Sequence, residues 1–112
     1  MELLVYITNR IELLDDLLER LSKESNFRAT LIDSMGMAHI LKDSNYFLSL
    51  RSLLNKSQVN SKTIIMALNS EDVDKAIEII ECVVGDLNDP DTGVVFTLPI
   101  SSFNKRIQEG KE

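Results

Sequence analysis

Acidic side chains gather in one short stretch of the sequence, where they could bind a divalent cation. Asp86, Asp89 and Asp91 lie close together with Asn88 among them, and Mg²⁺ and Ca²⁺ both prefer clustered carboxylate oxygens. The spacing lacks the full pattern of a calcium-binding loop. Because Asn-Asp-Pro-Asp-Thr-Gly is also what a turn requires, we interpret this stretch as a turn and predict no metal ligands in it.

The sequence offers no recognisable set of catalytic residues. His39 is the one histidine, and no Gly-x-Ser-x-Gly motif accompanies it, so a Ser-His-Asp triad has little support. Cys82 is the one cysteine, which excludes an intrachain disulfide and a zinc site built from several thiolates. A metal-binding or pH-sensing role for His39 stays open, but we interpret it as a polar loop residue. We predict that the protein is not an enzyme and requires no cofactor.

Length and charge narrow the remaining classes of function. The 112 residues suit a single domain, 1–112. The net charge of -6 argues against a protein that binds nucleic acid by neutralising phosphates. No apolar run approaches the length of a membrane span, and the first residues lack the basic flank and apolar segment of a secretory signal. We therefore expect a cytoplasmic protein without a membrane segment.

The first half of the chain reads as strand, helix, strand. Leu3 to Ile7 is an unbroken apolar run of strand length. Apolar residues then recur at helical spacing, which predicts a helix from about Arg10 to Lys23. Asn9 followed by Glu12 resembles a capping box at its start. Phe27 to Met35 alternates in a way that suits a second strand.

The second half repeats this order of elements. Ile64 to Leu68 is another apolar run of strand length. A helix should follow, with carboxylates in its first turn, an apolar stripe from Val73 to Val84, and Gly85 as a left-handed C-cap. Val94 to Ile100 predicts the fourth strand, and Pro99 belongs near a strand end or at an edge because it cannot donate to a ladder.

These elements predict an α+β fold of the ferredoxin-like βαββαβ type, a four-stranded antiparallel sheet with two helices on one face. We expect Leu4, Tyr6, Ile65 and Ala67 to lie on the other face, which the helices cannot reach. An apolar face of this kind needs a cover, since burying it is worth about 25 cal/mol per Å². The pattern therefore predicts a homo-oligomer that packs its sheets together.

The connection from Met37 to Ser61 is long for a compact domain, and connections of this length are usually functional. Phe47, Leu50 and Leu54 recur within it at helical spacing. We predict an extra short helix over Asn45 to Leu54, between strands two and three.

Four segments, in this order and on these elements, resemble the PII-like nitrogen-regulatory signalling family. They are Phe27 to Thr30, Asp33 to Met37, Val84 to Asp86, and Gly93 to Pro99 with its glycine, hydrophobic pair, phenylalanine and proline. The match spans nearly the whole chain. It implies a ferredoxin-like homotrimer that binds a small effector, typically an adenine nucleotide, in clefts between subunits and regulates a protein partner, with nitrogen metabolism as the pathway.

The resemblance also implies ligand-binding residues. Thr30 matches a threonine near the adenine, Gly36 and Met37 match the base of the family's effector-binding loop, and basic residues near the C-terminus reach phosphate from the neighbouring subunit. The loop after the second helix would wrap the phosphates, because its glycines let backbone N–H groups approach oxygen closely. The implied set is Thr30, Gly36, Met37, Gly85, Asp86, Thr92, Gly93, Lys105 and Arg106.

Two alternatives remain open beside this reading. Val94 stands where typical PII proteins have a phosphate-binding lysine, which favours a structural trimer that binds no ligand and docks a protein partner through Phe47, Leu50 and Leu54. A divalent-cation-binding trimer, of the related cation-tolerance type, is the second alternative.

Overall fold

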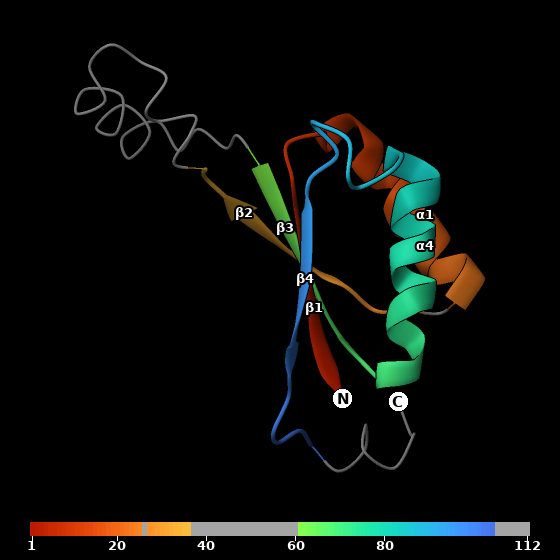
Figure 1. The fold of residues 1–112 in the computed structure, drawn as a ribbon, viewed down its shortest axis with the longest axis vertical. Coiled ribbons are helices and arrows are strands. Elements are labelled where there is room, and N and C mark those ends of the chain that lie inside the picture. Colours follow the sequence, from red (N-terminus) through yellow and green to blue (C-terminus); the bar gives the residue numbers. More distant parts are fainter. Residues whose placement is uncertain (26, 37–60, 105–112) are drawn as a thin grey trace, which may run out of the picture.

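The computed structural model describes residues 1–25, 27–36 and 61–104. Four strands form one antiparallel sheet in the order β2-β3-β1-β4 (Figure 1). They are β1 (Glu2–Thr8), β2 (Thr30–Ser34), β3 (Ser61–Leu68) and β4 (Val94–Pro99). Two helices, α1 (Leu14–Ser25) and α4 (Val73–Val84), each follow a short 3-10 turn, η1 (Ile11–Leu13) and η2 (Ser70–Asp72).

The predicted α+β fold class is confirmed. Both helices cover the same face of the sheet (Figure 1), and α1 and α4 contact each other there. Each helix links two strands that follow each other in the sequence but are not adjacent in the sheet. This makes two split βαβ units and is compatible with a ferredoxin-like fold. In the described ranges, neither helix is long and apolar enough to cross a membrane.

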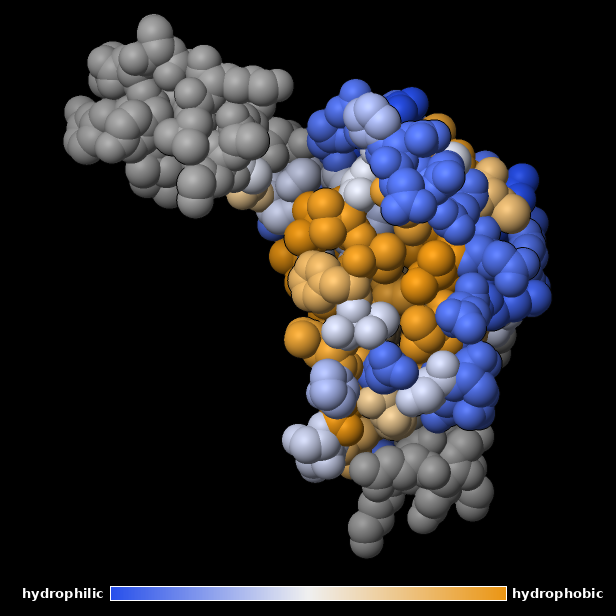
Figure 2. Space-filling view, in the orientation of Figure 1, coloured by the Kyte–Doolittle hydropathy of each residue, from blue (hydrophilic) through white to orange (hydrophobic). Residues whose placement is uncertain are grey.

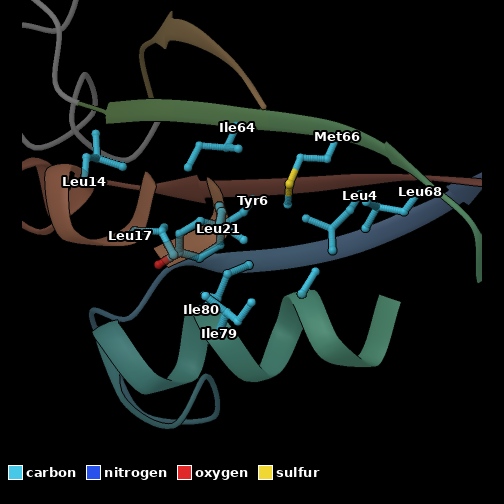
Figure 3. Packing of buried hydrophobic residues seen from close by; sticks show 11 residues of the cluster. Leu4, Tyr6, Leu14, Leu17, Leu21, Ile64, Met66, Leu68, Ile79 and Ile80 are labelled. Carbon is cyan, nitrogen blue, oxygen red and sulfur yellow. The ribbon is translucent and has the colours of Figure 1, made fainter. Parts of the chain in front are cut away.

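The hydrophobic core lies between this face of the sheet and the two helices. Leu4 pairs with Met66 and Tyr6 with Ile64, so these four side chains point to the same face. All four are at most 1% exposed. The helices contribute Leu14, Leu17, Leu21, Ala76, Ile79 and Ile80 from their apolar stripes (Figure 3). The predicted apolar stripes of both helices therefore pack on this face of the sheet.

The prediction for Leu4 and Tyr6 was wrong, because both lie under the helices and are 0% exposed. The register places Val5 opposite Ile65 on the other face, with Leu3 opposite Ala67. An unbroken apolar run carries no alternation that distinguishes its two faces. The expectation of an apolar outer face still holds, but β1 supplies it through its odd-numbered residues.

The start of the first helix also differs from the prediction. Arg10, not Asn9, occupies the N-cap position of η1, and it makes no side-chain cap hydrogen bond. Glu12 accepts a hydrogen bond from the Arg10 guanidinium instead of closing a capping box. The regular α-helix begins at Leu14 and ends at Ser25, later than predicted at both ends.

β2 and β3 differ most from their predicted bounds, whereas β1 and β4 differ by one residue at an end. β2 covers only 30–34 of the expected 27–35, and β3 begins three residues earlier than Ile64. The predicted helix over 45–54 and His39 lie outside the described residues. Gly85 ends α4 as expected and has a positive φ, but its φ of 97° with ψ of -174° is extended and is not the left-handed helical conformation.

Candidate functional site

The loop from Gly85 to Gly93 joins α4 to β4 and is held by hydrogen bonds within itself and to the helix end. The Gly85 and Leu87 amides donate to the backbone and side-chain oxygens of Glu81, both at 3.0 Å. The Asn88 amide donates to Asp86 Oδ1 at 2.9 Å, the hydrogen bond of an Asx turn. The prediction of a turn in this stretch therefore agrees with the local geometry.

The last residues of the loop are fixed against β1. The Tyr6 hydroxyl donates a short hydrogen bond to the Thr92 carbonyl oxygen, and the Thr92 hydroxyl donates to the Asp89 carbonyl at 2.8 Å. Gly93 has a φ of 103°, and a β-carbon there would lie 2.6 Å from the Ile7 carbonyl oxygen. Only glycine fits, because both the backbone conformation and the space exclude a side chain.

Tyr6 is the residue of this region that the sequence pattern missed. It sits inside an apolar run that we expected to place it on the outer face of the sheet, and its partner is 86 positions away. Burial raises the pKa of the Tyr6 hydroxyl above its ordinary value, and Thr8 and Arg10 oppose that rise. The hydroxyl therefore stays protonated and can donate to Thr92 at neutral pH.

Arg10 places a cation beside this end of the loop. Its amide donates to Thr8 Oγ1 at 2.9 Å and its Nε to Glu12 Oε2 at 2.6 Å. The ion pair lowers the pKa of Glu12 and raises that of Arg10, and the charge of Asp91 adds to the second effect. Glu12 and Asp91 are thus the acidic neighbours that act on the exposed guanidinium.

The other predicted ligand residues lie on β2, at the opposite edge of the sheet. Thr30 begins the strand and Gly36 follows its end, and both are exposed. Beside them Ser34 Oγ lies 2.7 Å from Ser61 Oγ, and the Thr63 hydroxyl donates to Ser34 at 2.9 Å. These three hydroxyls form a polar corner on the outer face of β2 and β3.

The register places Gly36 and Gly93 at one end of the sheet but far apart across it, and Thr30 lies away from that end, level with Phe96. Ser34 pairs with Ser61 and Ile7 with Val94, so the end of β2 and the start of β4 are at the same end. β3 and β1 lie between them, a separation of about 14 Å at normal strand spacing. One chain therefore does not bring Gly36 and Gly93 together. Met37, Lys105 and Arg106 lie outside the described residues.

The outer face of the sheet is apolar and carries no charged side chain among its described strand residues. Alternation from the register assigns it nine apolar and four hydroxyl residues. Val94, Phe96 and Leu98 of β4 are 59%, 43% and 48% exposed, and Ile32 of β2 is 44% exposed. Figure 2 shows hydrophobic residues gathered along β4, while the helices to the right are largely hydrophilic.

The described residues contain no cluster of side chains that could bind a metal ion. No group of three or more His, Cys, Asp or Glu side chains in residues 1–25, 27–36 and 61–104 is arranged to hold a metal ion. Asp86 instead caps its own turn.

Comparisons with known proteins give the fold and nothing more. No family model matches the sequence, and no curated protein matches it. Among solved structures, the chain is similar to the crystal structure of a functionally unknown protein from Pediococcus pentosaceus ATCC 25745. The TM-score is 0.62 at 19% identity, with 93% of this chain and 95% of that chain covered. This fold therefore occurs, over nearly the full length of both chains, in another protein.

Proposed function

We propose that this chain is a non-enzymatic PII-like regulator that assembles as a homotrimer and senses a small metabolite in clefts between its copies. An adenine nucleotide is the first ligand to test, and the regulated target is a protein partner, with nitrogen metabolism as the suggested pathway. The cytoplasm is the proposed location.

One observation carries this proposal. Among the described ligand residues that the resemblance implies, Gly36 follows the end of β2 and Thr92 and Gly93 precede β4, at the same end of the sheet but on opposite edges. Thr30 lies at the start of β2, level with Phe96. A site that uses both Gly36 and Gly93 must be completed by a second copy of the chain. The uncharged apolar outer face supports such an assembly, because its burial removes exposed Val94, Phe96 and Leu98 from water.

The loop from Gly85 to Gly93 suits a binding role in this assembly. Its hydrogen bonds to Glu81 and Tyr6 hold it in one conformation before any ligand arrives, which lowers the entropy cost of binding. A regulator also needs a second conformation whose affinity for the ligand differs. The segment from Met37 to Ser61 is the proposed place for that change.

The test measures assembly and ligand binding separately. Light scattering on the purified protein should give three times the mass of one chain. Calorimetric titration with AMP, ADP, ATP and cyclic nucleotides should detect binding by at least one of them, and Thr30→Ala should weaken it about tenfold, the loss of one good polar contact. Ser22→Ala, an exposed site on α1, is the matched control and should leave binding unchanged.

Each outcome separates one part of the proposal from another. A monomer at micromolar concentration would contradict the intersubunit cleft. A trimer that binds a nucleotide equally well after Thr30→Ala would retain the ligand class and reject the site.

A ligand-free structural trimer is the second candidate, and Val94 favours it. This residue begins β4 directly after the loop and is 59% exposed, so an apolar side chain stands where a phosphate would need a cation. A stable trimer without affinity for any nucleotide in the panel would select this candidate over the sensor.

A further inference from the structure

The last residues of the loop before β4 have an unusual backbone conformation. Asp91 has a φ of 63° and Gly93 a φ of 103°, so Thr92 lies between two residues with a positive φ. In residues 1–25, 27–36 and 61–104, Asp91 is the one residue other than glycine with a positive φ. Strained residues of this kind persist only where the surrounding structure holds them, and they concentrate at ligand-binding sites and switch regions. The strain at Asp91 therefore requires an anchor.

The first part of the loop is held by its own backbone amides. The Leu87 amide donates to the Glu81 carboxylate, and the Asn88 and Asp89 amides donate to Asp86. None of these bonds involves β1. This part of the loop therefore keeps its conformation through α4 and through itself, without support from the sheet.

Tyr6 connects the second part of the loop to β1. Its hydroxyl donates to the Thr92 carbonyl oxygen, and its ring, which lies among the core side chains (Figure 3), is directly against Gly93. The Thr92 hydroxyl extends this restraint to the Asp89 carbonyl. Tyr6 is 0% exposed and Thr92 is 6% exposed, so water does not compete for the bond between them. The anchor of the strained residues is thus a single buried hydroxyl.

We propose that Tyr6 is a positioning residue for the candidate site, which holds Asp91, Thr92 and Gly93 in the strained conformation that binds the ligand. This inference rests on the proposed function, because the ligand is the small metabolite proposed for the cleft. Tyr6 does not touch that ligand, since its side chain lies beneath the loop and is 0% exposed. Without its hydroxyl, the strained residues relax into other conformations.

This relaxation has a measurable effect on affinity. The apparent Kd of a ligand rises in proportion as the fraction of molecules in the binding conformation falls. The hydroxyl of Tyr6 therefore changes affinity through the loop equilibrium, while the bonds to Glu81 and Asp86 leave the first part of the loop in place.

Tyr6→Phe tests this role, because it removes one oxygen atom and keeps the ring. Calorimetric titration with AMP, ADP, ATP and cyclic AMP is carried out where circular dichroism shows the protein fully folded. The Kd of the nucleotide that binds the wild type most tightly should rise about tenfold, the effect of one lost hydrogen bond. Leu68→Val is the matched control. Leu68 is 5% exposed and pairs with Glu2 at the other end of the sheet, so this variant weakens the core and should leave the Kd unchanged.

NMR relaxation tests the effect on the loop without any ligand. In the wild type, the backbone amides of residues 91–93 should have order parameters of about 0.85, the value of rigid backbone. In Tyr6→Phe these order parameters should fall below about 0.6, or the same amides should show exchange on the microsecond-to-millisecond timescale. Leu87 and Asn88 serve as internal references and should be unchanged, because their amide bonds do not involve Tyr6.

The outcomes separate this role from the proposed function. If the wild type binds a nucleotide and Tyr6→Phe binds it equally well, the positioning role is overturned and the sensor stands. An equal rise in Kd for Leu68→Val would also overturn the role, because a general loss of stability would then explain both effects. Unchanged relaxation of residues 91–93 in Tyr6→Phe would do the same. A wild-type protein that binds no nucleotide in the panel would overturn the proposed ligand class and the positioning role together.

Discussion

Gly93 lies directly against the ring of Tyr6. A β-carbon at position 93 would lie 2.6 Å from Tyr6 Cε1 and 2.8 Å from Tyr6 Oη. The hydroxyl that causes part of this crowding also binds the carbonyl of Thr92. Tyr6 therefore both requires glycine at position 93 and holds the residue before it, so the loop and β1 form one packed unit.

The first prediction compares two glycines with a positive φ. Gly93→Ala should lower the free energy of unfolding by about 3 kcal/mol or more, because backbone strain adds to steric overlap with Ile7 and Tyr6. Gly85→Ala should cost only the strain, about 1–3 kcal/mol, since nothing lies within 4 Å of its β-carbon. Urea denaturation measures both values. Equal losses would contradict the close packing at Gly93.

The second prediction removes the Tyr6 hydroxyl alone. Tyr6→Phe keeps the ring in the core but leaves the Thr92 carbonyl without its donor, and this should cost about 2 kcal/mol. Chemical denaturation at pH 7 gives the value. Thr92→Ser, which retains the backbone carbonyl, is the control and should cost much less; an equal loss would place the effect in the Thr92 side chain.

The third prediction concerns alkaline pH. Burial raises the folded-state pKa of Tyr6 above its ordinary value of 10.0, so above pH 10 the unfolded chain loses its tyrosine proton before the folded chain does. The contribution of Tyr6 is fully present below pH 10 and is lost as the pH rises through the folded pKa. The stability difference between wild type and Tyr6→Phe should therefore shrink above pH 10. A difference that stays constant to pH 12 would reject the burial effect.

The fourth prediction introduces a charge on the outer face. Phe96→Asp should dissociate the proposed assembly without unfolding the chain, because Phe96 is 43% exposed and outside the core cluster, and a carboxylate buried at the proposed interface would be costly. Light scattering reports the mass and circular dichroism the fold. Ser22→Asp adds the same charge on the exposed surface of α1 and should leave the mass unchanged.

The fifth prediction addresses the hydroxyl corner. Ser34 exchanges a hydrogen bond with Ser61 and accepts one from Thr63, and Ser61 is 6% exposed. Ser34→Ala and Ser61→Ala should each destabilise the chain by about 1 kcal/mol. The double variant should cost less than the sum by about 0.5 kcal/mol or more. Strict additivity would mean that the two hydroxyls do not stabilise each other.

Sequence patterns predicted the elements well where periodicity was clear. The helix stripes and the apolar runs of β1 and β3 correspond to real elements, and Pro99 ends an edge strand as its missing amide hydrogen requires. The faces of β1 could not be predicted, because every residue from Leu3 to Ile7 is apolar or aromatic. Only the register with β3 and β4 shows which side meets the helices.

The glycines that end the loop were predictable as special backbone positions, but the contacts that hold the loop were not. Gly85 and Gly93 stand out in a sequence with four glycines, and both have a positive φ. The Tyr6 contact depends on a pairing between the two ends of the chain, and short-range spacing carries no signal for it. Arg10 was missed for the same reason, since its neighbour Asp91 is close only in the folded chain.

Pro99 also limits what the exposed edge of β4 can recruit. Because it offers a carbonyl but no amide hydrogen at the outward position, any ladder on this edge ends at Thr97 and spans only the few residues from Val94. Fibril-forming segments are typically six or seven residues long and free of proline. The edge can therefore accept a short strand of defined length while resisting the open-ended stacking that leads to amyloid.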